Sequence, residues 1–168
     1  MAWISVSPQI GQTAPGNIDA TQSQPIGTLA RFRDPIYGEG EFIYLPGVVS
    51  TAAGDVISFT TTDGATNTGS TTRWAGTANA NQPLAVASGA IGAGQWGWYQ
   101  VNGAGPVNSS GTVTAGQALY WQATATVSST AVASKQVTGM VAASANGVPS
   151  ANKTVVQLDR PSAQGAIT

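Results

Sequence analysis

The chain has 168 residues, of which six are Lys or Arg, seven are Asp or Glu, and none is His or Cys. Charged residues make up only 8%, so the sequence lacks the basic stripe that a nucleic-acid-binding protein needs to neutralise phosphate. The missing His and Cys exclude disulfides, thiol nucleophiles, imidazole bases and metal sites built on those ligands. The surface must consist mostly of Ser, Thr, Asn, Gln, Gly and Ala, which suits contact with other protein copies.

No secretory signal or transmembrane segment is expected. The start has no basic stretch followed by an apolar run, and no stretch approaches the ~18 apolar residues that span a bilayer. We therefore expect a protein that is made and folded in a cytoplasm and has no membrane partner.

Residues 1–35 are predicted to form an extended N-terminal arm. Pro8, Pro15 and Pro25 interrupt it, and its apolar residues follow neither the helical nor the strand period. Such a segment buries little apolar area by itself, so we expect it to become ordered against a neighbouring molecule. Trp3 has two possible positions: packed back onto its own domain, or anchored in another subunit.

Strands are predicted from about residue 40 onward, where short runs rich in β-branched and aromatic residues lie between Gly and Pro. Examples are Glu41–Leu45, Asp55–Phe59 and, as the last strand, Thr154–Leu158. An Ala-Gly-Asp or Ala-Gly-Gln triplet precedes three such runs, which predicts a tight turn before each. These triplets lie at 53–55, 93–95 and 115–117.

The remaining segments complete an all-β prediction. The Thr- and Gly-rich stretch 60–82 predicts a surface excursion with its tip near Asp63-Gly64, attached to the body by Trp74. Asn102-Gly103 and Asn146-Gly147 are two-residue turn signals. Helix evidence is thin, because two glycines break the Ala-rich stretch 83–94. We predict a small β-barrel or β-sandwich with at most one short helix, a body over 36–161 and a C-terminal tail over 162–168.

The sequence GQWGWYQVNG at 94–103 concentrates three large aromatic residues in a chain that is only 7% aromatic. Alternate strand residues point to opposite faces, so Trp96 and Trp98 share one face and Tyr99 and Val101 the other. A strand with large residues on both faces is either buried on both faces within its own domain, or buried on one face and docked to a partner with the other. The favoured interpretation is a core or subunit seam formed by Trp96, Trp98, Tyr99, Tyr120 and Trp121, and the alternative is an exposed platform for sugar.

Few groups suggest catalysis. Glu39 and Glu41 lie on one strand, whereas the two carboxylates of a glycosidase must flank the scissile bond. Ser150 and Lys153 have Ser-x-x-Lys spacing without the accompanying motifs. The glycine run 89–94 has neither the Lys nor the helix of a phosphate loop. We therefore predict no enzymatic activity and no cofactor.

A metal site is not predicted, although calcium stays a minor alternative. The acidic residues that could hold a hard cation show no EF-hand spacing. They are Asp55, Asp63 and Asp159.

Two stretches carry a family resemblance. One is YGEGEFIYLPGV followed by AAGDVISF, and the other is VTGMVAASANG followed by KTVVQL. With these, roughly residues 36–160 resemble the small capsid decoration (cement) proteins of tailed bacteriophages. The resemblance implies a small β-barrel or β-sandwich, usually a homotrimer, on the outside of a capsid, with an N-terminal extension that reaches a neighbour.

The resemblance therefore predicts a virion structural protein that stabilises the outer capsid surface by bridging neighbouring capsomers. Its partners would be the major capsid protein and its own copies. Contacts to the capsid or a neighbour are expected from Trp3, Ile4, Ile10, Arg31, Arg33 and Asp34. Two alternatives stay open: a glycan- or host-surface-binding module of a fibre or head appendage, with Trp74, Trp96, Trp98 and Tyr99 as its platform, and a head–tail completion subunit.

Overall fold

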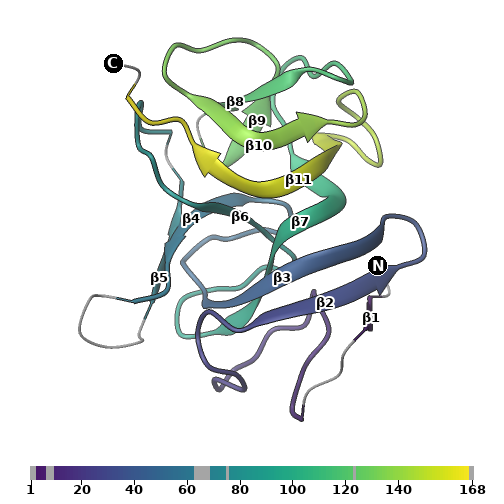
Figure 1. Cartoon of the computed structure of the whole chain (residues 1–168), viewed down its shortest axis with the longest axis vertical. Helices are drawn as coiled ribbons and strands as arrows, with labels where there is room; N and C mark the ends of the chain where they lie inside the picture. The colour runs from purple at the N-terminus through teal and green to yellow at the C-terminus, as the bar shows by residue number, and fades with distance from the viewer. Residues whose placement is uncertain (1–2, 7–9, 63–68, 75, 123, 167–168) are drawn as a thin grey trace.

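The computed structural model describes residues 3–6, 10–62, 69–74, 76–122 and 124–166. The all-β prediction is confirmed, because these residues form strands and turns and no helix, and the strands belong to one large antiparallel sheet that does not close (Figure 1). No helix in this part of the chain is thus long and apolar enough to cross a membrane. The Ala-rich stretch 83–94, in which two glycines argue against a helix, contains the buried strand Leu84–Ala87.

Eleven strands occur in the described residues. They are β1 (Ile4–Ser5), β2 (Leu29–Asp34), β3 (Gly38–Pro46), β4 (Val56–Thr60), β5 (Ser70–Arg73), β6 (Leu84–Ala87), β7 (Trp96–Asn108), β8 (Ala118–Gln122), β9 (Thr126–Ser128), β10 (Gln136–Ala142) and β11 (Lys153–Ala163). The last strand extends to Ala163, so it includes the first residues of the predicted tail.

The long strand β7 lies at the centre of the sheet. The strand order is β1-β2-β3-β7-β11-β10-β8-β9, while β6 also pairs with β7 and connects it to β4 and β5. The first half of β7 pairs with β3 and the second half with β11. In Figure 1, β8–β11 consequently form the upper part of the molecule and β1–β3 the lower part, with β7 running between them.

The buried apolar side chains form three clusters. The N-terminal cluster consists of Trp3, Ala30, Phe32, Phe42, Tyr44 and Trp98. The central cluster consists of Ile26, Ile43, Leu45, Ile57, Ala85, Ala87, Ile91, Tyr99 and Val101. The C-terminal cluster includes Val56, Trp74, Leu84, Val86, Val107, Leu119, Trp121, Met140, Val156 and Leu158. Alternate residues of β3, β4 and β6 enter different clusters, so these strands form layers between them.

β7 contributes to all three clusters. Trp98 enters the N-terminal cluster, Tyr99 and Val101 the central cluster, and Val107 the C-terminal cluster. The predicted alternation of the aromatic run between two faces is therefore confirmed, and both faces are buried within the chain itself. An aromatic residue that loses contact with water over most of its surface contributes strongly to stability, so this strand couples the packing of the whole molecule.

The turn predicted at Asn102-Gly103 is wrong, because both residues lie inside β7. Gly103 has φ of 92° and lies so close to β3 that a Cβ there would be 2.5 Å from the Glu39 carbonyl oxygen. The Gln100 amide nitrogen donates hydrogen bonds to the carbonyl oxygens of Asn102 (3.1 Å) and Ala104 (2.9 Å). At Asn102-Gly103 the chain does not reverse. Instead, β7 pairs with β3 before this point and with β11 after it.

Other turn predictions are confirmed. Asn146-Gly147 lies in the connection between β10 and β11, and the glycines of the three Ala-Gly triplets all have positive φ, at 92°, 73° and 80°. The excursion after β4 is a hairpin to β5 whose expected tip, Asp63-Gly64, lies outside the described residues. Trp74 attaches this hairpin to the body. The centroids of its ring and of the Trp121 ring are 4.2 Å apart, in an edge-to-face arrangement.

The packing around Trp121 predicts different effects of two glycine substitutions. Gly76 and Gly94 have nearly equal φ, 72° and 73°, but a Cβ on Gly76 would overlap the Trp121 ring, whereas one on Gly94 would meet nothing within 4 Å. Gly94→Ala should cost about 1–2 kcal/mol of unfolding free energy from backbone strain alone, and Gly76→Ala at least about 2 kcal/mol more. Urea denaturation measures both, and equal losses would contradict the packing.

Candidate functional site

The described part of segment 1–35 lies along its own body. β1 pairs with β2, and Asp19 and Trp96 exchange two backbone hydrogen bonds of 2.9 Å. Of the two positions considered for Trp3, the structure shows the first: Trp3 is 8% exposed, and its ring lies 4.8 Å from that of Phe42. The segment therefore has a defined place within a single chain.

The Asp19 carboxylate fixes this arrangement. Its Oδ2 accepts a hydrogen bond of 2.6 Å from the Tyr44 hydroxyl and another from the Ser23 hydroxyl. Burial raises the pKa of Tyr44 above 10.0, and the hydrogen bond to Asp19 raises it further. Sequence reasoning missed Asp19, although one signal was present: it is the only acidic residue before Asp34.

The six residues expected to make contacts divide into three groups. Ile4 and Ile10 are exposed, at 67% and 102%, and Arg31 and Arg33 project outward from β2. Trp3 belongs to the N-terminal cluster. Asp34 is only 2% exposed, and its Oδ1 accepts the backbone N–H groups of Ile36 and Tyr37 at 2.8 and 3.0 Å. Asp34 is therefore a turn residue and not part of a contact surface.

Exposed large apolar side chains are frequent among the first 36 residues of the sequence. Nine large apolar residues in the described part of the chain are exposed, and six of them lie between residues 4 and 36. We call these six the N-terminal apolar set: Ile4, Val6, Ile10, Ile18, Leu29 and Ile36. Single exposed apolar residues are normal on monomeric proteins, whereas contiguous apolar patches mark contact with a partner.

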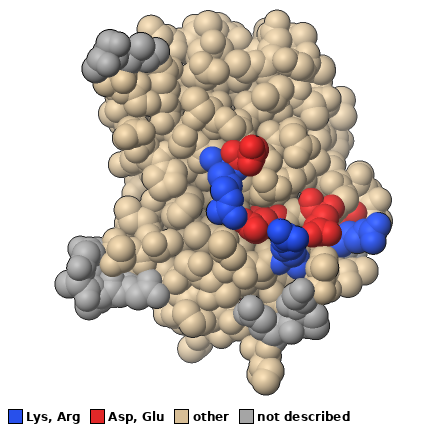
Figure 2. Space-filling model, in the orientation of Figure 1, with Lys and Arg blue, Asp and Glu red and all other residues tan. Residues whose placement is uncertain are grey.

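The exposed charges lie in one band, which borders the N-terminal apolar set, because Arg31 and Arg33 lie on β2 and Arg33 pairs with Ile4. Among the described residues, the charged side chains in the exposed class are Arg31, Arg33, Glu39, Asp159 and Arg160. Figure 2 shows charged side chains of both signs as a band across one face, while the rest of that face is uncharged. Two ion pairs lie in the band, Arg31–Glu39 at 3.6 Å and Arg160–Glu41.

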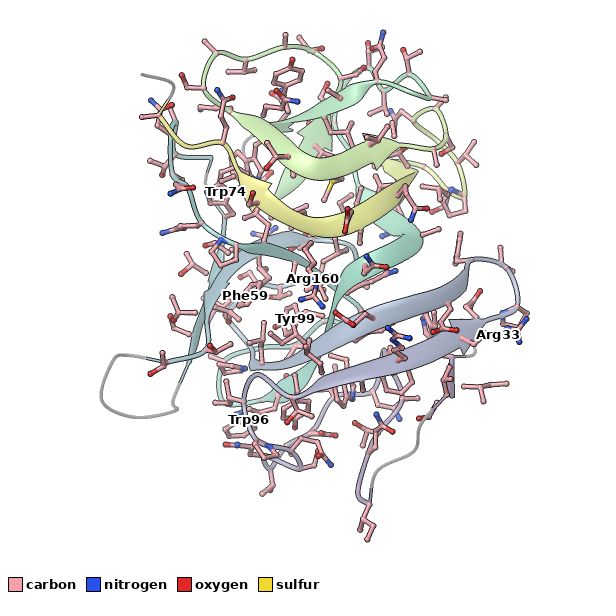
Figure 3. The ribbon with its side chains drawn as sticks, viewed as in Figure 1. Arg33, Phe59, Trp74, Trp96, Tyr99 and Arg160 are labelled. Carbon is pink, nitrogen blue, oxygen red and sulfur yellow. The ribbon has the colours of Figure 1, made fainter. Side chains whose placement is uncertain are left out.

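Arg160 connects the two halves of the molecule across this band. It has φ of 43°, in the left-handed region, and the register between β10 and β11 shifts beside it, at Thr138 to Met140. Such a bulge redirects a side chain, and here the Arg160 guanidinium from β11 reaches Glu41 on β3. In Figure 3, Arg160 lies in front of the centre of the molecule, far from Arg33 at the end of β2.

The groups considered for chemistry are occupied by other interactions. Glu39 and Glu41 each pair with an arginine. The Lys153 ammonium donates to the Ala53 carbonyl and the Asn108 side chain, and no hydrogen bond joins it to the Ser150 hydroxyl in the described structure.

The acidic residues do not assemble a metal site within the described ranges. No group of three or more His, Cys, Asp or Glu residues there could hold an ion. Asp55 binds Arg73 instead, with 2.7 Å between Nε and Oδ2, and accepts a hydrogen bond of 2.8 Å from Asn108. Asp63 lies outside the described residues.

The aromatic residues of β7 and β8 are mainly core residues. Trp98, Tyr99 and Trp121 are almost completely buried, while Trp96 and Tyr120 are half-buried. Trp74 is buried as well. The sugar platform considered for Trp74, Trp96, Trp98 and Tyr99 is therefore not formed, because three of its four rings face the interior; in Figure 3, Trp96 lies near the lower end of the molecule, away from Trp74.

No protein-family model, no curated protein and no solved structure matches this chain. Its function is therefore inferred from the surfaces described above.

The hydrogen bond between Tyr44 and Asp19 predicts a specific loss on mutation. Tyr44→Phe leaves the Asp19 carboxylate with one donor fewer and should lower the free energy of unfolding by about 1–2 kcal/mol. Tyr120→Phe is the matched control, since the Tyr120 hydroxyl makes no hydrogen bond with the described residues. Urea denaturation compares the two variants, and equal stabilities would show that the bond does not hold the segment.

Tyrosine burial also predicts a loss of stability at high pH. Desolvation raises the pKa of Tyr99 and of Tyr44 above the ordinary value of 10.0. The native state therefore keeps these protons where the unfolded chain releases them, and stability present below pH 10 falls as the pH rises further. Between about pH 9 and about pH 11, Tyr44→Phe should lose less unfolding free energy than the parent protein. A larger loss in the variant would contradict this assignment.

Proposed function

We propose that this chain is a structural protein of a phage virion, which binds the outside of the capsid and bridges neighbouring capsomers. Its partners would be the major capsid protein and further copies of itself, most simply as a homotrimer. The sequence resemblance to capsid decoration proteins suggests this role.

The N-terminal apolar set is the observation that carries the proposal. Five of its six exposed apolar side chains lie on segment 1–35, which is fixed to the body through β1, Trp3 and Asp19, and the sixth, Ile36, lies in the turn after β2. A fixed segment loses little conformational entropy when it binds, so burial of Ile4, Ile10 and Ile36 against a lattice would favour association directly. Binding through a segment that is already packed on its own body thus replaces the ordering of a free arm against a neighbour, which the sequence predicts.

The distribution of charge is consistent with the same role. Interface centres are depleted of charged residues, and outside the band the described surface consists mainly of neutral side chains. A weak contact made by each copy is multiplied on a capsid, because a bridging protein engages two capsomers simultaneously. Arg31 and Arg33, which lie beside Leu29 on β2 and opposite β1, would form part of the polar rim of this contact.

A capsid-binding experiment tests this proposal. Purified protein is mixed with undecorated capsids of the virus that encodes it, and occupancy is measured by sedimentation and by mass. The triple variant Ile4→Ser, Ile10→Ser, Ile36→Ser should lower the apparent affinity by at least about 100-fold, because each buried Ile contributes about 1.5–3 kcal/mol.

The matched control is the double variant Val141→Ser, Val148→Ser, which changes exposed apolar residues outside the N-terminal set. It should bind like the parent protein. Circular dichroism should show that both variants remain folded, since all five side chains are exposed. Unchanged occupancy of the triple variant, or no binding by the parent protein, would overturn the proposal.

A further inference from the structure

A pocket of about 250 Å³ lies where the N-terminal cluster meets the upper half of the molecule. Its lining includes the aromatic residues Trp3, Tyr37 and Phe42 and the prolines Pro106 and Pro149. The remaining lining comes mainly from the turn before β4, the end of β6 and the residues at and just before the start of β11. An apolar pocket with a few polar groups at its rim is the usual form of a small-molecule site.

Three polar groups at this pocket have unused hydrogen-bonding capacity. The Lys153 ammonium donates to the Ala53 carbonyl oxygen at 2.8 Å and to Asn108 Oδ1 at 2.7 Å, which leaves one of its three N–H donors. Within the described structure, the hydroxyl groups of Tyr37 and Ser150 make no hydrogen bond. All three residues line the pocket, so a ligand could bind these groups without displacing an existing partner.

The charge near Lys153 favours an anion. Lys153 is the only charged residue among those that line the pocket in the described structure. The nearby Asp55 carboxylate is already bound by Arg73 at 2.7 Å, so two positive charges stand against one negative charge. The Asp34 carboxylate, three residues before Tyr37, already accepts hydrogen bonds from two backbone N–H groups. Burial lowers the pKa of Lys153, and Asp55 only partly opposes this, so an added anion would stabilise the ammonium.

We propose that this pocket binds a small molecule that consists of one six-membered ring and a carboxylate. The ring packs against the aromatic residues and prolines of the lining, where apolar contacts are available. The carboxylate accepts hydrogen bonds from Lys153 and from the Ser150 hydroxyl. The pocket volume limits the ligand to about one substituted ring. Both an aryl carboxylate and a uronic acid sugar have this chemistry.

Binding of four probe compounds to the intact protein distinguishes an aryl carboxylate ligand from a uronic acid ligand. Benzoate and glucuronate are the carboxylate probes, and benzyl alcohol and glucose are their neutral counterparts. Isothermal titration calorimetry gives Kd values, and ¹H–¹⁵N spectra locate the site through shifts at Phe42, Gly54 and Ser150. We expect at least one carboxylate to bind at least about 10-fold more tightly than its neutral counterpart.

Two lysine variants test the role of the ammonium. Lys153→Met should weaken carboxylate binding at least about 10-fold, whereas Lys135→Met, the matched control at the turn before β10, should not. Because Lys153 also donates a hydrogen bond to Asn108, Ser150→Ala provides a second test that leaves this bond intact. It should weaken binding of the carboxylate more than binding of the neutral probe. The proposal is overturned if neither carboxylate binds, if the neutral probes bind equally well, or if shifts map elsewhere.

Discussion

The burial of β7 on both faces is the constraint on which the rest of the structure depends. Trp98 packs against the N-terminal cluster, Tyr99 and Val101 pack against the central cluster, and Val107 enters the C-terminal cluster. A strand of this kind cannot lose one neighbour without exposing large apolar side chains to water. It also supplies the backbone groups that bind Asp19, so the position of the N-terminal segment depends on it too. The proposed capsid contacts and the pocket are both built on this shared support.

Much of the fold could be predicted from local sequence. β-Branched and aromatic runs between Gly and Pro predict β3, β4, β7, β8 and β11, and the Ala-Gly triplets predict the turns before three of them, because both signals act over a few residues. Asn102-Gly103 was misread for the same reason. A local Asn-Gly signal usually reverses the chain, but here the partners of β7 on either side keep it extended, and those partners are distant in sequence. The three-cluster layering likewise arises from long-range pairing that no local pattern contains.

The candidate surfaces were less predictable. Ile4 and Ile10 are exposed whereas Trp3 packs on Phe42, and the scattered apolar residues of this segment contain no local pattern that separates the two environments. The ordering of segment 1–35 depends on Asp19, whose partners Tyr44 and Trp96 lie 25 and 77 residues further along the chain. The pocket combines residues from the beginning, middle and end of the sequence. Such sites are visible only after the chain has folded.

Native-state hydrogen exchange of the isolated protein tests the central claim most directly. If β7 joins all three clusters and holds the N-terminal segment, the amides of both halves of β7 should exchange only through global unfolding, with one common free energy of opening. The Asp19 amide, which donates to the Trp96 carbonyl oxygen, should also be protected in the absence of any partner. An unprotected Asp19 amide, or clearly different opening free energies for the two halves of β7, would contradict the account.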